Sequence, residues 1–324
     1  MELTNEYTEQ NIPLTPSIVG EDEFIRSVYI NPLTDFGFKK LFYNKELLIA
    51  FLNDVVGTGI KDITYLPTEG LGEYKEERVT NFDLLCTNDM GEFFIVEMQL
   101  GHQTYFRDRV LFYASQVIRK QAPRKKRWDF NLKAVYVVSV LNFITFIEES
   151  AKDTVIEKVY LYRAKAKKTF SDKLNMVFIE LPKFNKQASD LRDNTDTWLY
   201  LLKNAFFLKT CPPEIKGKTF RLFLEIAEIK NLTPKEMETY QKSLKNNFYI
   251  RDIANFARME GRMEGRMEGR MEGKMEGRME GRRERDIQIA LKLLKKGASF
   301  EEVVDMTELS KEQVLELFHQ LPES

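Results

Sequence analysis

A nearly continuous run of apolar side chains, AVYVVSVLNF at 134–143, constrains the fold of this chain more than any other feature. A strand that is apolar along its whole length has to be buried on both faces. With 324 residues, 43% of them hydrophobic and 24 of them phenylalanine, the chain can build the core that covers such a strand. The run therefore predicts an α/β domain in which a mixed sheet is flanked by helices.

Helical and strand patterns alternate on either side of this run. Apolar residues at spacings of three and four predict one helix that ends near Phe42, a second that begins near Lys45 and a third over 104–121. Thr34 or Asp35 would cap the first of these helices. Short segments rich in β-branched and aromatic residues predict further strands at IKDITYLP, VTNFDLLCT, EFFIVEMQL and NMVFIELPKF. The predicted order is α, β, β, β, α, β, β.

The sequence beyond Asp190 has a wholly helical pattern and then becomes a repeat. Thr233, followed by Pro234 and Glu236, has the spacing of a capping box at the start of a helix. The motif MEGR, once MEGK, then occurs six times without interruption. We expect an N-terminal arm at 1–30, a core at 31–190, a helical subdomain at 191–258, a repeat stalk or linker at 259–282 and a three-helix module at 283–324.

Composition excludes several classes of function. Lys and Arg number 49 against 50 Asp and Glu, so no overall field attracts nucleic acid or an anionic membrane. No apolar run has the length of a membrane span, and neither a membrane nor a small-molecule cofactor is expected as a partner. Two cysteines, Cys86 and Cys211, and no apolar leader favour a reduced, cytoplasmic location. Because His102 and His319 are the only histidines, the ligands of any metal would be oxygens.

Three polar side chains interrupt the two apolar strands of a hairpin predicted at 81–100. A short loop that ends at Gly91, which is free to take a positive φ, sets a register in which Asp83 lies opposite Glu97. Their side chains would be about 5 Å apart, where two anions repel each other unless a cation lies between them. Gln99 points to the same face as Glu97. We therefore expect a site for Mg²⁺, which prefers oxygen ligands; the alternative is an ordinary solvent-exposed hairpin edge.

Five segments in this order resemble the PD-(D/E)XK nucleases and, more narrowly, the Rpn family of recombination-promoting nucleases, which are PD-(D/E)XK nuclease family transposases. The segments are TDFGFKKLF, FDLLCTNDMGEFFIVEMQ, YFRDRVLFYASQVI, NLTPKEMETYQKSLKNNFYIRDI and the tail of EG repeats. The resemblance covers the chain from Asn31 to about Gly281. It implies an αβββαβ core of the restriction-endonuclease type, with an all-helical C-terminal extension.

The resemblance implies a metal-dependent endonuclease that hydrolyses phosphodiester bonds of DNA in recombination or in mobile elements. Asp83 and Glu97 would hold Mg²⁺, for which Mn²⁺ substitutes, and the backbone carbonyl of Met98 would be a further ligand. Gln99 would take the place of the usual catalytic lysine, where it orients a water but carries no charge. Phe82 stands in place of the name-giving proline, a change without effect on the chemistry. The alternative is a scaffold that binds DNA or a protein partner and is catalytically weak.

Further polar residues would support this site. Arg109, Tyr113, Gln116 and Lys120 form a polar stripe along the predicted helix at 104–121. The resemblance implies that Arg109 and Tyr113 hold phosphate or a metal-bound water. An ordinary solvated helix face would show the same pattern.

Two other segments would add charge near the site. Asp35 and Lys39 would contribute an acid and a cation from the first helix, although the start of a helix explains an acid there as well. The stretch RKQAPRKKRW at 119–128 holds six cations in ten positions. It would contact DNA phosphates without reading bases, through Arg124, Lys125, Lys126 and Arg127. A solvated loop would have the same composition.

The repeat at 259–282 is a marginal helix in isolation. Gly at every fourth position costs about 1 kcal/mol each relative to Ala, and opposite charges lie two or six residues apart, where they do not pair. We expect a helical stalk if the chain forms a homo-oligomer through this segment, and a flexible tether if it does not. A spacer that arose by expansion of a short coding repeat is the alternative.

The last segment, 283–324, predicts three short helices, with Gly297 ending the first and capping boxes at Ser299 and Ser310. Its outline is similar to a helix-turn-helix. The candidate recognition helix SKEQVLELFHQ, however, has one Lys against two Glu, which is a poor face for DNA. A protein-interaction or capping module is therefore favoured over sequence-specific DNA reading.

Overall fold

The computed structural model describes residues 27–68, 82–101, 103–122 and 128–319, and for 250–261 and 264 it describes the backbone alone. The chain forms two compact units, one that ends at Ala254 and one that begins at Asn255. Each unit has a hydrophobic core of its own. The domain limits that the sequence suggests at 190 and 258 stay predictions.

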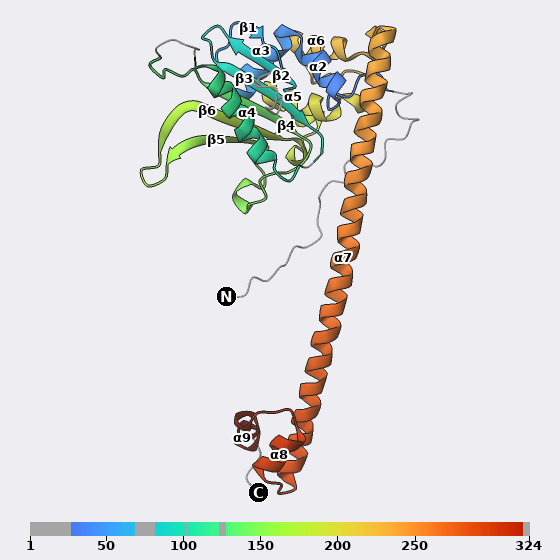
Figure 1. The fold of residues 1–324 in the computed structure, drawn as a ribbon. Helices are drawn as coiled ribbons and strands as arrows, with labels where there is room; N and C mark the ends of the chain where they lie inside the picture. The colour runs from blue at the N-terminus through green and yellow to red at the C-terminus, as the bar shows by residue number, and fades with distance from the viewer. Residues whose placement is uncertain (1–26, 69–81, 102, 123–127, 320–324) are drawn as a thin grey trace, which may run out of the picture. The chain divides into compact units, whose positions relative to one another are not determined.

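A mixed sheet of six strands forms the centre of the first unit (Figure 1). Its strands lie in the order β1, β2, β3, β4, β6, β5, with β4 parallel to both of its neighbours and the remaining pairs antiparallel. They are β1 (Ile63–Tyr65), β2 (Leu84–Asn88), β3 (Phe93–Gln99), β4 (Val135–Leu141), β5 (Ile156–Arg163) and β6 (Lys168–Glu180). The α/β class predicted from the sequence is confirmed.

Helices cover both faces of this sheet (Figure 1). Val137 of β4 packs in a core with α4 (Phe106–Lys120), whereas its neighbour Val138 faces the opposite layer. The apolar run at 134–143 is thus buried on both faces, as predicted. The opposite layer contains α2 (Asp35–Phe42), α3 (Lys45–Val56), α5 (Asn194–Asn204) and α6 (Lys218–Ala227).

The first helix begins where the chain turns sharply after Asn31. Thr34 caps α2, because its hydroxyl accepts a hydrogen bond from the Gly37 N–H at 2.9 Å. A Cβ atom at Gly37 would lie 2.1 Å from the Asn31 carbonyl oxygen, so this turn requires glycine. The cap is therefore Thr34 and not Asp35, and the predicted end of α2 and start of α3 are confirmed.

The strand β5 is not predicted from the sequence. It forms an antiparallel hairpin with β6 at one edge of the sheet, and β6 begins at Lys168, earlier than the predicted strand that starts at Asn175. The outer part of this hairpin is exposed, with Tyr162 at 57% and Phe170 at 71%. An edge strand mixes charged and apolar side chains and so gives a weaker signal than a buried strand.

The helix α7 (Pro234–Lys295) contains the whole repeat. It begins with the predicted capping box, in which the Thr233 N–H donates to the Glu236 carboxylate at 2.9 Å. It ends just before Gly297, which has a φ of 82°. The segment predicted as the first helix of the terminal module is therefore the end of α7, and two short helices follow it, α8 (Phe300–Met306) and α9 (Lys311–His319).

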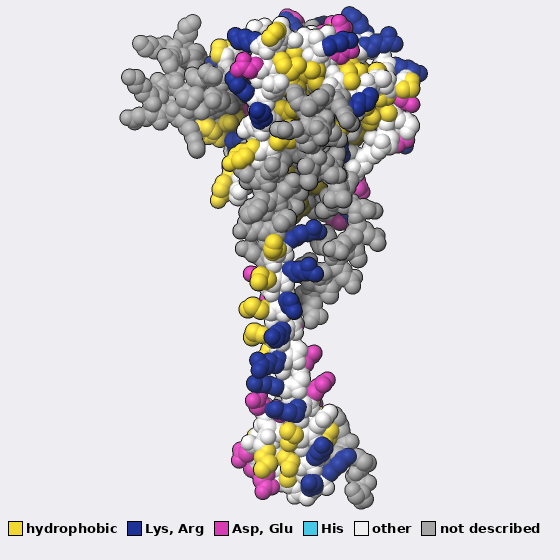
Figure 2. Space-filling model, turned by 90° about the vertical axis from the view of Figure 1, so that its right-hand side faces the viewer, with side chains coloured by type: hydrophobic (Ala, Val, Ile, Leu, Met, Phe, Trp, Pro, Cys, Tyr) yellow, Lys and Arg dark blue, Asp and Glu magenta, His cyan; other side chains and the backbone are white. Residues whose placement is uncertain are grey.

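The second unit combines a small core with a long exposed helix surface. Its core consists of Ala290, Leu294, Val303, Leu309 and Val314. The predicted capping boxes at Ser299 and Ser310 are both present. In the repeat, the described side chains of α7 are exposed, and Figure 2 shows hydrophobic side chains in a row beside a row of Lys and Arg. No helix in the described part of the chain combines the length and the apolarity needed to cross a membrane.

Candidate active site

The hairpin of β2 and β3 has the register predicted from its turn. Leu84 pairs with Val96 and Leu85 with Ile95. The turn closes because the Asn88 side-chain oxygen accepts the N–H groups of residues 90 and 92 at 3.0 and 2.9 Å, and because Gly91 has a φ of 76°. Asp83, directly before β2, is therefore placed opposite Glu97 of β3.

Two reciprocal hydrogen bonds hold these carboxyl groups in place. The Met98 N–H donates to Asp83 Oδ2 at 2.8 Å, and the Asp83 N–H donates to Glu97 Oε1 at 3.2 Å. Asp83 thus binds the backbone N–H of the residue after Glu97, and Glu97 binds the backbone N–H of Asp83 itself. The second oxygen of Asp83, Oδ1, accepts no hydrogen bond from the described residues, so it remains open to another ligand.

Ionisation of either carboxyl group is unfavourable in the folded protein. Glu97 is only 3% exposed, and burial together with the charge of Asp83 raises its pKa to about 8. Burial also raises the pKa of Asp83, and the Met98 N–H and the positive charges of Lys39 and Arg109 offset this rise only in part. One buried and one half-buried acid, both with raised pKa values, lack positive charge, and a bound cation would supply it.

A chain of polar side chains continues from Glu97 toward α4. The Gln99 amide donates to Glu97 Oε2 at 3.2 Å, and the Gln103 amide donates to Gln99 at 3.0 Å. Arg109 of α4 closes the ring, because one of its nitrogens donates to Gln103 and another lies 3.7 Å from Glu97 Oε2. No pattern in the sequence indicates Gln103, since a single glutamine between a strand and a helix has no distinctive spacing.

Aromatic rings hold Arg109 over the site. Its guanidinium lies 5.5 Å from the centre of the Phe106 ring and 5.4 Å from that of Tyr113. The Tyr113 ring packs edge-on against Phe82, 5.0 Å away. Arg109 Nε is buried and has no hydrogen-bond acceptor among the described residues. The structure thus brings Arg109 and Tyr113 to the hairpin, whereas their binding of phosphate or a metal-bound water stays a prediction.

The model of the PD-(D/E)XK nuclease family transposases matches residues 32–256. The chain belongs to this family. Searches among curated proteins and among solved structures find no match. The mixed sheet flanked by helices is consistent with the PD-(D/E)XK fold.

In this family member, α2 brings a lysine close to the acid pair. Lys39 forms an ion pair with Asp35 at 2.6 Å, and its side chain is 35% exposed. Burial lowers the pKa of Lys39, but the hydrogen bond and charge of Asp35, together with the charge of Asp83, outweigh burial and leave the pKa raised. Asp35 is 62% exposed and bonded to Lys39, so it faces solvent more than the acid pair.

A serine on the next strand completes the surroundings of Glu97. Ser139 of β4 pairs with Glu97 in the parallel register, which places both side chains on the face of the sheet that α4 covers. The Ser139 hydroxyl is fully buried and has no hydrogen-bond partner among the described residues. Together with Arg109 Nε, it is a buried donor in need of an acceptor, such as an ordered water. The signal in the sequence is one polar residue within the run at 134–143.

Other residues expected at the site lie elsewhere. Lys120 is exposed at the last residue of α4, about 16 Å along the helix from Arg109 at 1.5 Å per residue, and so it does not join the carboxylates. Gln116 is half-buried on the same helix. The proposed DNA-contact residues Arg124, Lys125, Lys126 and Arg127 fall outside the described residues.

The donor set of the hairpin fits a hard divalent cation. Asp83, Glu97 and the Met98 carbonyl offer oxygen atoms, which Mg²⁺ and Mn²⁺ prefer, and Mg²⁺ commonly keeps several waters besides two carboxylates. Within the described ranges, no group of three or more acidic, histidine or cysteine side chains could enclose an ion. Two carboxylates and one carbonyl would leave coordination positions of the ion for waters or a substrate phosphate.

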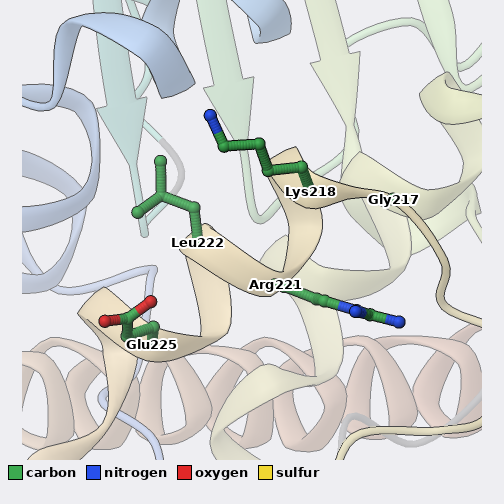
Figure 3. Close-up of a pocket in the computed structure, with 5 residues that line it drawn as sticks. All are labelled: Gly217, Lys218, Arg221, Leu222 and Glu225. Carbon is green, nitrogen blue, oxygen red and sulfur yellow. The ribbon is translucent and has the colours of Figure 1, made fainter.

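Two hollows at the surface of the described residues differ in their relation to this site. One, of about 370 Å³, lies on α6, where Lys218, Arg221 and Glu225 point apart from each other (Figure 3). Diverging charges of this kind do not form a reaction centre. The other, of about 330 Å³, lies at the start of α4 and borders the polar ring through Gln103.

Proposed function

We propose that this chain is a metal-dependent DNA endonuclease that hydrolyses phosphodiester bonds at the Asp83–Glu97 hairpin, in recombination or in mobile elements. The observation that carries the proposal is the acid pair of buried Glu97 and half-buried Asp83, fixed by reciprocal hydrogen bonds and left with raised pKa values. Membership of the PD-(D/E)XK nuclease family transposases supports the same reaction class and DNA as the substrate.

The two acids and the Met98 carbonyl would hold Mg²⁺ or Mn²⁺. When bound there, the ion would polarise the scissile phosphate and acidify a water that attacks it. Glu97 is positioned for this task by the Gln99 amide and the Asp83 N–H, which each bind one of its oxygens. Asp83 keeps one oxygen, Oδ1, unbonded among the described residues, so it is the acid more accessible to the ion.

Gln99 positions groups and does not supply charge. Its amide nitrogen donates to Glu97 and its oxygen accepts from Gln103, so both ends of the side chain are already engaged. Positive charge for the transition state must then come from other residues. We assign it to Lys39 of α2 and to Arg109 of α4, whose charges act on Asp83 and, for Arg109, also on Glu97. The Arg124–Arg127 patch is proposed to hold DNA further along, and the cytoplasm is the proposed location.

A catalytically weak scaffold is the second candidate. The observation that favours it is Gln99 itself, since the residue in the place of the usual lysine is uncharged and bonded on both sides. In that case the hairpin would bind DNA or a protein partner with little turnover. The two candidates differ in one measurable property, namely metal-dependent cutting that requires Glu97.

The test is nicking of supercoiled plasmid with Mg²⁺, with Ca²⁺ or with EDTA, for the wild type, Glu97→Ala and Glu97→Gln at matched folding. Asp172→Asn, a change at an exposed acid of β6 six residues before Phe178, which is in register with Glu97 through Ser139, is purified in parallel as a control. We expect Mg²⁺-dependent nicking by the wild type and the control only. Equal nicking by all proteins would point to a contaminant and contradict the assignment of Glu97. A folded wild type that neither nicks DNA nor binds Mg²⁺ would leave the scaffold as the function.

A further inference from the structure

The repeat makes each row of side chains on α7 chemically uniform. Four residues advance an α-helix by about 400°, so positions four apart lie almost above one another. From Arg262 to Arg282 the chain repeats every four residues, and each such row therefore contains one kind of side chain. Figure 2 shows a row of methionine beside a row of Lys and Arg. The methionine row consists of Met263, Met267, Met271, Met275 and Met279.

In a single chain this segment is poorly supported. The five methionines are 58% to 73% exposed, which forms a continuous apolar row on an otherwise charged helix. Among the described residues, nothing lies within 4 Å of where a Cβ would stand at the glycines from Gly265 to Gly281, so none of them packs against the glycine row. Glycine disfavours an isolated helix. A second helix packed on the methionine row would supply the missing contacts.

The period of four favours one particular packing of two helices. Rows of residues four apart are the ridges that interlock when two helices cross at about −50°. The methionine row drifts about 40° around the helix with each repeat, which is too fast for a long coiled coil of the heptad kind. Two copies would therefore cross, with their methionine rows in contact near Met271, the middle of the row.

The charges decide the direction of the second helix. Around α7, the methionine row lies between a row of glutamates on one side and a row of Lys and Arg on the other. A two-fold axis along a parallel pair brings the glutamate side of one helix against the basic side of the other, on both flanks. An antiparallel pair would bring glutamate against glutamate. The segment Arg262–Arg282 holds six basic and five acidic residues, a balance that does not favour DNA.

We propose that residues 262–282 bind a second copy of this chain in parallel, with the methionine rows at the centre and each glutamate row beside the basic row of the partner. This inference concerns a surface of the second unit and does not depend on nuclease activity. Because opposite charges face each other on both flanks, the pairing should be selective for this direction. The result is a homodimer with a crossing and not a long coiled coil.

Three full-length variants test the charge pairing by sedimentation and light scattering. An acidic variant carries Glu at all six basic positions of 262–282, and a basic variant carries Arg at its five glutamates. An exchange variant carries both sets of changes. We expect the wild type and the exchange variant to be dimers, each single-sign variant to dissociate at least about tenfold more readily, and an equimolar mixture of the two to form a heterodimer. A circular dichroism spectrum of each full-length variant that retains the signal of the first unit shows that the variant is folded.

Two results on the oligomeric state would overturn the proposal. One is a wild type that is monomeric at low salt and high concentration. This result would also overturn the proposal if the monomeric wild type retards DNA and the acidic variant does not. The other is a dimer that persists in both single-sign variants. Direction is tested with spin labels at residue 283 in a Cys211→Ser background. A parallel pair keeps the two labels on the same side of the crossing, whereas an antiparallel pair separates them by on the order of 35 Å along the helices and would also contradict the proposal.

Discussion

At the scale of single residues, the chemistry depends on how Glu97 is surrounded. It has Asp83 opposite, Gln99 and Arg109 within its polar ring, and Ser139 beside it on β4. Arg109 is the only one of these groups that is cationic, and its nearest nitrogen is 3.7 Å from Glu97, beyond hydrogen-bond distance. The metal-free site is therefore short of positive charge, and this shortage can be measured without any substrate.

The pH dependence of stability should reveal the buried charge. In the metal-free protein Glu97 has a pKa of about 8, against an ordinary value of 4.5. Between these values the unfolded chain is ionised while the folded one keeps its proton, so the free energy of unfolding falls as pH rises from about 4.5 to about 8. Glu97→Gln should lose this decline and exceed the wild type at pH 8 in EDTA by at least about 1 kcal/mol.

Denaturant unfolding in EDTA and in Mg²⁺ checks this expectation. Added Mg²⁺ should stabilise the wild type at pH 8 and leave Glu97→Gln unchanged, because a ligand stabilises only the state that binds it. If the wild type and Glu97→Gln show the same pH profile in EDTA, Glu97 is ionised in the folded state without a raised pKa.

Lys39 should supply charge that Gln99 lacks. Replacing it by methionine removes the cation near Asp83, so we expect Mg²⁺-dependent nicking to fall about 10- to 100-fold, while Lys39→Arg retains most of it. The neighbouring Lys40 is a matched control, because its ammonium is bonded to Glu236 at 2.5 Å and not to the acid pair. Lys40→Met should nick DNA at the wild-type rate. A similar loss in both methionine variants would indicate damage to α2 instead of a role for Lys39.

At the scale of elements, local patterns identify the parts of the fold that are buried or tightly turned. The hairpin register follows from the turn at Asp89–Gly91, so the sequence alone predicts that Asp83 lies opposite Glu97. By contrast, β5 lies at an edge of the sheet. Its side chains are less buried there, so apolar and polar residues do not alternate in a recognisable strand pattern. Ser139 and Gln103 join the site only through tertiary contacts, which no spacing in the sequence encodes. Lys120 and Arg109 lie on the same polar stripe of α4, but Lys120 is the last residue of the helix and lies too far along it to reach the acid pair.

The turn before α2 should be highly sensitive to one methyl group. Gly37→Ala would place a Cβ 2.1 Å from the Asn31 carbonyl oxygen, an overlap with backbone that cannot be relieved by rotating a side chain. We expect a loss of stability of about 2 kcal/mol or more in urea unfolding. Gly59→Ala is the control, since its Cβ would meet nothing within 4 Å, and it should lie within about 0.5 kcal/mol of the wild type. Equal effects of the two changes would mean that the α2 turn relaxes freely.

The end of β6 is held by a buried ion pair. Glu180 and Lys183 are 0% and 4% exposed and 2.5 Å apart, and Lys183 also donates to the carbonyls of Phe146 and Ala151. Lys183→Met would leave Glu180 buried without its partner, at a cost of about 3 to 5 kcal/mol. Adding Glu180→Gln removes the unpaired charge, so the double variant should recover part of the loss in the same unfolding assay. Glu180 also accepts the N–H groups of Thr145 and Phe146, so a double variant less stable than Lys183→Met would show that the charge of Glu180 stabilises this segment even without Lys183.

At the scale of the whole molecule, the chain consists of two units with separate cores and different features. The first unit contains the sheet, the acid pair and both candidate cations, and it ends at Ala254. The second unit has a core of five buried side chains and a long row of exposed methionines. Cores that share no residues can unfold separately, so changes in the repeat should leave the stability of the nuclease unit intact.

A chain that ends at Arg258 tests this division together with the proposed dimer. It keeps the first unit, so its thermal midpoint should stay within about 2 °C of the corresponding transition of the full chain, a shift that corresponds to less than about 1 kcal/mol. Nicking per chain should persist. In the proposed nuclease, one Asp83–Glu97 pair would cut one strand at a time, so losing the second copy should lower the ratio of linear to nicked plasmid. The exchange variant of the repeat keeps the dimer and should keep the wild-type ratio. An unchanged ratio in the shortened chain would mean that cutting both strands needs no partner bound through 262–282.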